Sequence, residues 1–149
     1  MDEPANRLPR TAVGYWRAKG VVQGLGLLVA GGVASARVVP LFPFLAALVV
    51  ATVLVAVLPE WRWRRWRYEI RDDEIDLLHG TLIRKRTLVP IRRVQHVDTE
   101  TGPLQDSYDV ASVTFHTAAG TVAIPALTKR EAEEVRLRVA ELARTRDDT

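Results

Sequence analysis

The pattern of apolar positions divides the chain into two parts near residue 60. Residues 20–39 are moderately apolar, and residues 41–58 are eighteen consecutive positions without a charge. At ~1.5 Å of rise per residue, eighteen helical residues cover about 27 Å, close to the ~30 Å hydrocarbon core of a bilayer. Residues 20–59 are therefore predicted to form a transmembrane helical hairpin with a tight turn around residues 37–40.

Small side chains are frequent in the first apolar run. They let a second helix approach closely in lipid, so we expect the two spans to pack on each other in preference to forming a dimerisation face. The residues concerned are Gly24, Gly31, Gly32, Ala34, Ser35 and Ala36.

Two other interpretations of the apolar runs are weaker. Basic residues before the first run and the Ala34-Ser35-Ala36 sequence resemble a secretory signal with a cleavage site, but a second apolar run follows immediately. A buried hairpin of a soluble protein would require the remaining 90 or so residues to cover nearly all of both runs.

From Trp66 onward the apolar period changes to two, the mark of half-buried strands. Trp66, Tyr68 and Ile70 alternate with charged residues. Pro125 is expected to end the last strand. The expected elements are strands at 66–70, 74–78, 81–89, 110–117 and 121–124, with one helical turn at 103–108. A short connection at 91–98 is expected to lead into a fourth strand that continues to about Thr101.

A C-terminal helix is predicted from a capping box, in which Thr128 and Glu131 exchange hydrogen bonds with each other's backbone. Apolar residues follow at three- and four-residue spacing and form one stripe that can cover a sheet. They are Ala132, Val135, Val139 and Leu142. The fold class is thus an α+β membrane protein, a two-helix transmembrane hairpin followed by an antiparallel β-roll capped by a C-terminal α-helix.

The boundary between the two parts is rich in tryptophan and arginine. Aromatic rings favour the membrane–water interface, and arginines beside a span mark its cytoplasmic side. Stacking on single-stranded nucleic acid is the alternative, but the position directly after a span favours anchoring. The candidate membrane-interface residues are Trp61, Arg62, Trp63, Arg64 and Arg65.

Charge predicts the orientation and the domain boundaries. Four basic residues precede the first run and four arginines lie at 62–67, so both termini are expected in the cytoplasm, with the protein in the cell (cytoplasmic) membrane. Residues 1–19 are expected to be a loose cytoplasmic N-terminal arm, and residues 60–149 a cytoplasmic domain.

Composition excludes several functions. The chain has no cysteine, which removes disulfides, thiolate nucleophiles and cysteine metal sites. Residues 59–149 contain sixteen basic and sixteen acidic residues, whereas a nucleic-acid-binding module is usually basic itself. We therefore expect no nucleic-acid partner.

Several blocks resemble the bacterial pleckstrin-homology-like (PH-like) membrane proteins, the YdbS-like group. They are residues 90–98 (PIRRVQHVD), 102–104 (GPL), 111–118 (ASVTFHTA) and 124–127 (IPAL), followed by Glu131-Ala132. The resemblance implies a bent antiparallel sheet capped by the last helix, on a membrane hairpin. It implies no established enzymatic activity and defines no functional residues. Members commonly have Gly-Leu where this chain has Asp109-Val110, which leaves that turn open.

A stretch without acidic residues, from Leu77 to Val97, is the candidate lipid or partner patch. Near an anionic membrane each basic side chain contributes roughly 1 kcal/mol. The alternative is a solvated strand whose arginines pair with acidic residues at 72–76. The patch residues are Arg84, Lys85, Arg86, Arg92 and Arg93.

Catalytic and metal-binding patterns are weak. His79, His96 and His116 lie on separate predicted elements without a metal-ligand spacing. A hydrolase triad built from His96 would lack a nucleophile elbow. No metal, cofactor or enzymatic activity is expected.

The sequence therefore predicts a non-enzymatic, membrane-anchored interaction or scaffold module. Its expected partners are membrane lipids and itself, a paralogue or another membrane protein. An anionic-lipid sensor and an accessory subunit of an export or transport complex are the alternatives.

Overall fold

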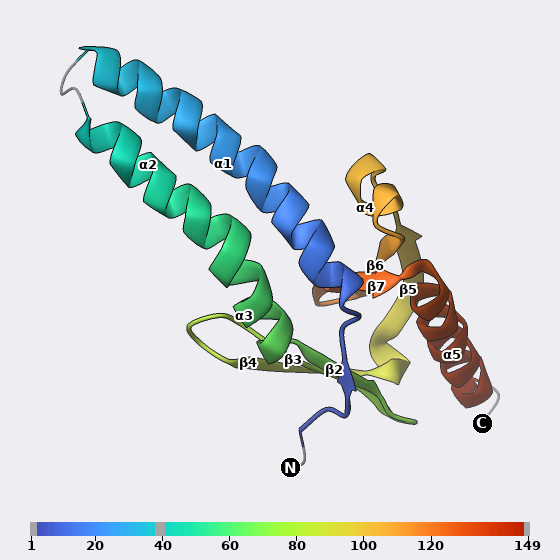
Figure 1. The fold of residues 1–149 in the computed structure, drawn as a ribbon. Helices are drawn as coiled ribbons and strands as arrows, with labels where there is room; N and C mark the ends of the chain where they lie inside the picture. Colours follow the sequence, from blue (N-terminus) through green and yellow to red (C-terminus); the bar gives the residue numbers. More distant parts are fainter. Residues whose placement is uncertain (1–2, 38–40, 148–149) are drawn as a thin grey trace.

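Two long helices project from a small β-rich domain (Figure 1). The computed structural model describes residues 3–37 and 41–147. Helix α1 is Thr11–Arg37, and the second helical run comprises α2 (Phe42–Thr52), a π-helical turn (Val53–Val57) and α3 (Leu58–Arg65). Residues 38–40 of the turn predicted at 37–40 lie outside the described residues.

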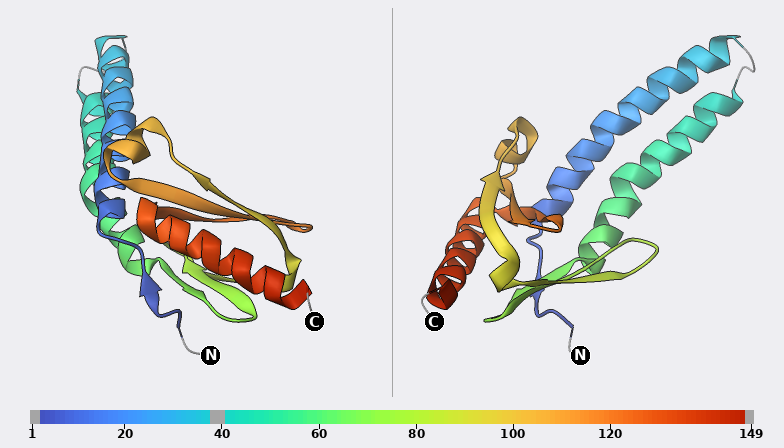
Figure 2. Two further views of the ribbon diagram at one scale, coloured as in Figure 1. Left: turned by 90° about the vertical axis from the view of Figure 1, so that its right-hand side faces the viewer. Right: turned by 180° about the vertical axis from the view of Figure 1, so that it is seen from behind.

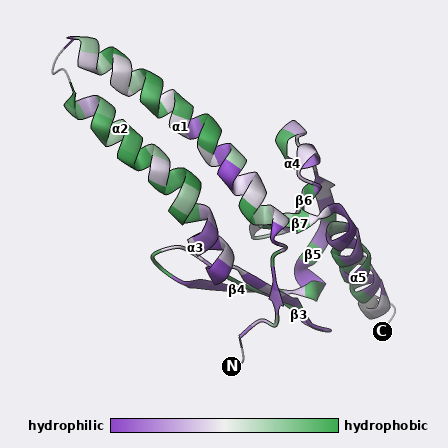
Figure 3. Cartoon of the chain, in the orientation of Figure 1, coloured by the Kyte–Doolittle hydropathy of each residue, from purple (hydrophilic) through white to green (hydrophobic). Residues whose placement is uncertain are grey.

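Both helical runs are long and apolar enough to cross a membrane. Only 17% and 11% of their most apolar windows are buried, so they are not core helices of the domain. Colouring by hydropathy shows the same division, with apolar residues along the hairpin and mixed polarity elsewhere (Figure 3). The interpretation as a buried hairpin of a soluble protein is therefore wrong.

Glycines on one face of α1 allow the two helices to approach closely. A Cβ on Gly20 would lie 2.6 Å from the Leu54 carbonyl oxygen, and one on Gly31 would lie 2.8 Å from Ala47 Cβ. Gly24 packs on Ala51 in the same way. Gly32, expected at this contact, faces open space among the described residues. The close packing of the two helices is thus confirmed, with Gly20 as an additional contact.

The domain contains two antiparallel sheets (Figure 2). The first has the order β1-β2-β3-β4, and the second β5-β6-β7. The 3-10 turn Ile91–Arg93 joins β4 to β5, and the short helix α4 (Pro103–Ser107) joins β5 to β6. The strands are β1 (Asn6–Arg7), β2 (Arg67–Ile70), β3 (Glu74–His79), β4 (Lys85–Pro90), β5 (Val94–Glu100), β6 (Val110–Thr117) and β7 (Gly120–Thr128).

Helix α5 (Lys129–Asp147) covers the second sheet (Figure 2). The capping box is present: Glu131 N–H donates to Thr128 Oγ1 at 3.1 Å, and Thr128 N–H donates to Glu131 Oε2 at 3.2 Å. The apolar stripe of α5 packs into the core as predicted. Fully buried side chains of this core include Ile75, Leu77, Ile91, Val113, Phe115, Ile124, Leu127 and Val139.

The expectation of a loose N-terminal arm is wrong. Asn6 and Arg7 pair with Arg67 and Tyr68 as a short strand, and Leu8 is only 2% exposed. Helix α1 begins at Thr11, and Trp16 in its second turn is buried in the domain. Strand β1 could not be predicted from the pattern of residues, because it has only two residues, too few for an alternating pattern.

Three strand boundaries also differ from prediction, and the structure defines the turn that was left open at Asp109. Strand β5 begins at Val94, within the segment that was expected to be a connection. Strand β4 begins at Lys85 instead of Thr81, because Gly80 adopts φ +123° and turns the chain. Strand β7 continues through Pro125, where the pairing with β6 is shifted by an irregularity that accommodates the missing N–H. Asp109 has φ 53°, the left-handed conformation that glycine favours and aspartate tolerates, so the turn forms without the glycine.

Candidate membrane-interface site

The tryptophan- and arginine-rich boundary joins the hairpin to the domain. It forms the end of α3, and only Trp66 separates it from β2. Trp63 Nε1–H donates a 2.8 Å hydrogen bond to the Leu8 carbonyl, and the Arg10 guanidinium lies 4.5 Å from the centre of the Trp63 ring. Trp63 is thus bound to the N-terminal segment, so its role is to hold α3 against β1.

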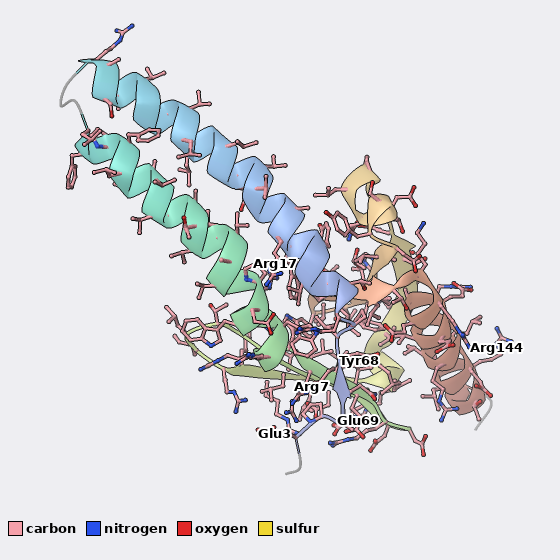
Figure 4. The ribbon with its side chains drawn as sticks, viewed as in Figure 1. Glu3, Arg7, Arg17, Tyr68, Glu69 and Arg144 are labelled. Carbon is pink, nitrogen blue, oxygen red and sulfur yellow. The ribbon has the colours of Figure 1, made fainter. Side chains whose placement is uncertain are left out.

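Glu60 provides a second connection between the same segments. Its carboxylate lies 3.0 Å from Arg10 Nη1, 3.5 Å from Arg64 Nε and 4.0 Å from Arg17 Nη2. Figure 4 shows Arg17 at the base of α1, and Arg7 on β1 beside Tyr68 and Glu69 of β2. Arg10, Glu60 and Trp63, with the Leu8 carbonyl, form what we term the clasp.

The other two arginines of the candidate interface lie on tryptophan rings. Arg62 is 4.5 Å from the centre of the Trp16 ring on α1, and Arg65 is 5.1 Å from that of Trp61. Such cation–π contacts contribute roughly 0.5–1 kcal/mol at exposed sites and more where water is excluded. Trp61 is 37% exposed and faces outward, as an interfacial anchor would.

Two cavities adjoin Arg62. One of about 120 Å³ lies between α1 and α3 and is lined by Trp16, Lys19, Gln23 and Arg62 among others. The other, of about 350 Å³, lies between α3 and the β3–β4 loop and is lined by Leu58, Arg62, Trp66 and residues 79–81.

The second cavity brings Arg62 close to His79. Burial lowers the pKa of His79 below its ordinary value, and the charges of Lys85 and Arg62 lower it further. Lys19 and Arg62 line the first cavity and Arg62 lines the second, in each case beside apolar side chains. Cations beside apolar walls suit a phosphate group attached to a lipid.

The five basic residues of the predicted patch fall into two groups. Arg84 directly precedes β4, Lys85 and Arg86 are its first two residues, and Arg92 and Arg93 follow its end. Four strand residues, 87–90, lie between the two groups and span about 13 Å. The predicted patch is therefore divided between the two ends of β4.

The alternative interpretation, in which arginines of the patch pair with acidic residues at 72–76, is confirmed in part. Arg86 binds Asp76, as expected for the acidic residues at 72–76, but Arg84 pairs with Glu3 of the N-terminal segment at 3.3 Å. Asp76 is fully buried and also binds Arg71 at 3.2 Å. The sequence pattern does not reveal this burial, because Asp76 lies between Ile75 and Leu77, which are also fully buried.

The β3–β4 loop exposes an apolar tip. Leu82 and Ile83 are 82% and 83% exposed, the highest values among large apolar side chains of the described residues. Arg84 and Lys85 follow directly, and the base of the loop lines the cavity beside α3. An apolar tip with adjacent cations is typical of segments that lie in a membrane interface.

Comparison with known proteins shows which proteins this chain is similar to. The family described as Bacterial PH domain matches residues 13–143. The UPF0699 transmembrane protein YdbS of Bacillus subtilis (strain 168) is 34% identical over 155 residues, covering 99% of this chain and 98% of YdbS. The UPF0699 transmembrane protein YdbT of the same strain is 29% identical over 79 residues, covering 50% of this chain and 16% of YdbT. No solved structure gives a significant match.

Proposed function

Because the chain belongs to the bacterial PH domain family, we propose that it is a non-enzymatic interaction module. In this proposal the hairpin anchors the domain in the cell membrane with both termini in the cytoplasm. The domain assembles with a second copy or with a related PH-like membrane chain. The observation that carries the proposal is the clasp, which connects the hairpin and the domain without a flexible linker.

Rigid attachment matters because it restricts where the domain can move. A domain held at the bilayer by a short connection meets partners of the same membrane at a high effective concentration. It also presents the same edge to every neighbour, so a weak contact can be selective. The family relationship supports the choice of partner, since the relatives YdbS and YdbT come from one organism.

Strand β5 is the edge that we assign to the partner. It pairs with β6 on one side, and its other side has no strand partner within the described residues. A groove of about 280 Å³ runs between β5 and α5, lined by Val94, Val97, Val139 and Ala143 among others. Addition of a strand to such an edge is a common mode of recognition.

Cysteine crosslinking in native membranes tests the assignment. The chain contains no cysteine, so one introduced at exposed Gln95 on β5 gives a single reactive site. We expect Gln95→Cys, labelled with a maleimide photo-crosslinker, to link to a second copy or to a PH-like chain. Gly-Ser spacers inserted after Pro9 and after Arg65 are expected to reduce the yield several-fold, because effective concentration falls once both connections are loose.

The matched control is Arg130→Cys, at a side chain that is 89% exposed on α5. Arg130→Cys should react with the maleimide as fully as Gln95→Cys does, but should form few crosslinks to another chain. Equal yields from both positions, or only uncrosslinked monomer from Gln95→Cys, would count against assembly through β5.

A second candidate function is binding of anionic phospholipid, favoured by the two cavities that share Arg62. We propose that a lipid phosphate lies between Arg62 and Lys19, with its acyl chains along the hairpin. Leu82 and Ile83 would then enter the interface beside it. Arg84 and Lys85 remain candidates for further headgroup contacts, whereas Arg92 and Arg93 lie at the opposite end of β4.

Thermal unfolding of the full-length protein in detergent tests lipid binding. We expect phosphatidylglycerol to raise the melting temperature of the wild type more than phosphatidylcholine does, because only a ligand bound to the folded state stabilises it. Lys19→Gln and Arg62→Gln should each lose most of this difference. Arg64→Gln should retain it, since Arg64 pairs with Glu60 and lines neither cavity. The same shift with both lipids, or in all variants, would exclude the site.

A further inference from the structure

Two histidines that are distant in sequence face each other across two strands. His96 on β5 is the registered partner of His116 on β6, and their rings stack with centroids 4.1 Å apart and planes 11° apart. Directly opposed residues of an antiparallel pair have neighbouring side chains on one face. The pairing register of β5 and β6 thus brings the two histidines together, although they are twenty residues apart in the sequence.

Asp98 completes the cluster. It lies two residues after His96 on β5, so its side chain is on the same face of the strand. Its Oδ2 atom is 2.9 Å from His116 Nε2 and 3.7 Å from His96 Nε2. One donor atom from each of the three residues lies within 4.8 Å of the others.

The cluster faces away from the core. Val97 and Phe115 alternate with these residues along the same strands and point inward, and Phe115 is fully buried. The side chains of His96 and Asp98 are 60% and 50% exposed. An ion could therefore enter from solvent without any rearrangement of the core.

His116 is the least exposed residue of the cluster, and its Nε2 atom lacks a hydrogen-bond partner among the described residues. This atom is shielded from solvent, and among the described residues no partner meets it with hydrogen-bond geometry. The Asp98 oxygen is near enough for an ion pair but is not aligned as an acceptor. A shielded ring nitrogen directed at a carboxylate is the arrangement that a shared metal ion would satisfy.

From this geometry we infer that His96, Asp98 and His116 bind a divalent transition metal, with Zn²⁺ as the best fit. Zinc takes imidazole nitrogen and carboxylate oxygen at about 2.0–2.2 Å in a tetrahedron, which separates its ligand atoms by roughly 3.3–3.5 Å. The two donor separations at Asp98, 2.9 and 3.7 Å, lie on either side of that range. To bind one ion, both imidazole rings must also turn out of their stacked, nearly parallel planes so that the lone pairs of the two nitrogen atoms converge. His96 and Asp98 lie on an exposed surface that leaves room for this rotation.

Three protein ligands leave the fourth position to water or to another molecule. A metal here would join β5 to β6 through side chains and so fix the strand at the edge of the sheet. The competing explanation is a simple ion pair between His116 and Asp98, which would need neither His96 nor a metal. The two explanations differ in the effect of substituting His96.

Calorimetric titration of the untagged, full-length protein with ZnCl₂, after treatment with a chelator, measures the binding. We expect one ion per chain. His96→Gln, His116→Gln and Asp98→Asn should each weaken binding by roughly tenfold or more, since even outer-shell partners of metals have effects of that size. Zinc should also raise the melting temperature of the wild type, because the site exists only in the folded state.

The control variants are Glu100→Gln and His79→Gln. Glu100 is an exposed carboxylate on the same strand, and His79 is the only other histidine. Both variants should bind zinc as the wild type does. Side-chain NMR of the three histidines adds a test that does not depend on affinity: zinc should shift the signals of His96 and His116 and leave those of His79 in place. Absence of zinc binding by the wild type, or wild-type zinc affinity in either His96→Gln or Asp98→Asn, would overturn the site.

Discussion

Replacing Gly20 by alanine is expected to lower the stability of the protein by about 1–3 kcal/mol, the usual cost of inserting a methyl group where no space exists. The new Cβ would lie 2.6 Å from the Leu54 carbonyl oxygen, a backbone atom that cannot rotate away. The two helices must then separate. Because helices in lipid are held together by close packing more than by the hydrophobic effect, separation removes much of their attraction.

Gly26→Ala is the matched control. Gly26 lies on the same helix, but a Cβ there would meet nothing within 4 Å among the described residues. We expect this change to be neutral or stabilising by about 0.5–1 kcal/mol, since alanine is the better helix former. Thermal unfolding in detergent, followed by tryptophan fluorescence, compares the two variants. If both behaved alike, the packing assigned to Gly20 would be wrong.

Asp76→Asn is expected to lower the free energy of unfolding by about 3 kcal/mol. Loss of one partner from a buried ion pair costs roughly 3–5 kcal/mol, and the lower end applies because Arg71 and Arg86 are 30% and 24% exposed. The amide keeps the shape of the side chain, so the effect isolates its charge. Two guanidinium groups would then share a single neutral acceptor at the centre of the first sheet.

The control for charge is Asp72→Asn. Asp72 is 87% exposed and its ion pair with Arg138 spans 3.2 Å at the surface, so its loss should cost less than about 1 kcal/mol. Chemical or thermal unfolding of both variants measures the difference. A similar effect of the two substitutions would show that water reaches Asp76.

Elements that repeat a local pattern could be predicted from the sequence. The alternation from Trp66 to Ile70 identified β2, and the Thr128–Glu131 capping box identified the start of α5, because each pattern is determined by neighbouring residues. The resemblance to the PH-like family identified the arrangement of these elements. The membrane hairpin followed from the length of its apolar runs alone.

The features that the sequence could not provide are those produced by long-range pairing. Strand β1 exists only because Asn6 meets Tyr68, and the His96–His116 pair exists only because β5 and β6 have one particular register. The glycine face of α1 was visible as composition, but the choice of Gly20 over Gly32 depends on the rotation of one helix against the other. The clasp likewise joins residues 55 and 50 positions apart.

The pairing of β1 with β2 also constrains membrane topology. One strand precedes the hairpin and the other follows it, and their backbones are hydrogen-bonded to each other. Strands on opposite sides of a bilayer cannot pair, so the chain between them must cross the membrane an even number of times. The segments before and after the hairpin therefore lie in the same compartment. This conclusion follows from the even number of crossings and does not depend on the distribution of charge. The first sheet can therefore form only after both spans have been inserted, because β2 reaches the compartment of β1 only after the second crossing.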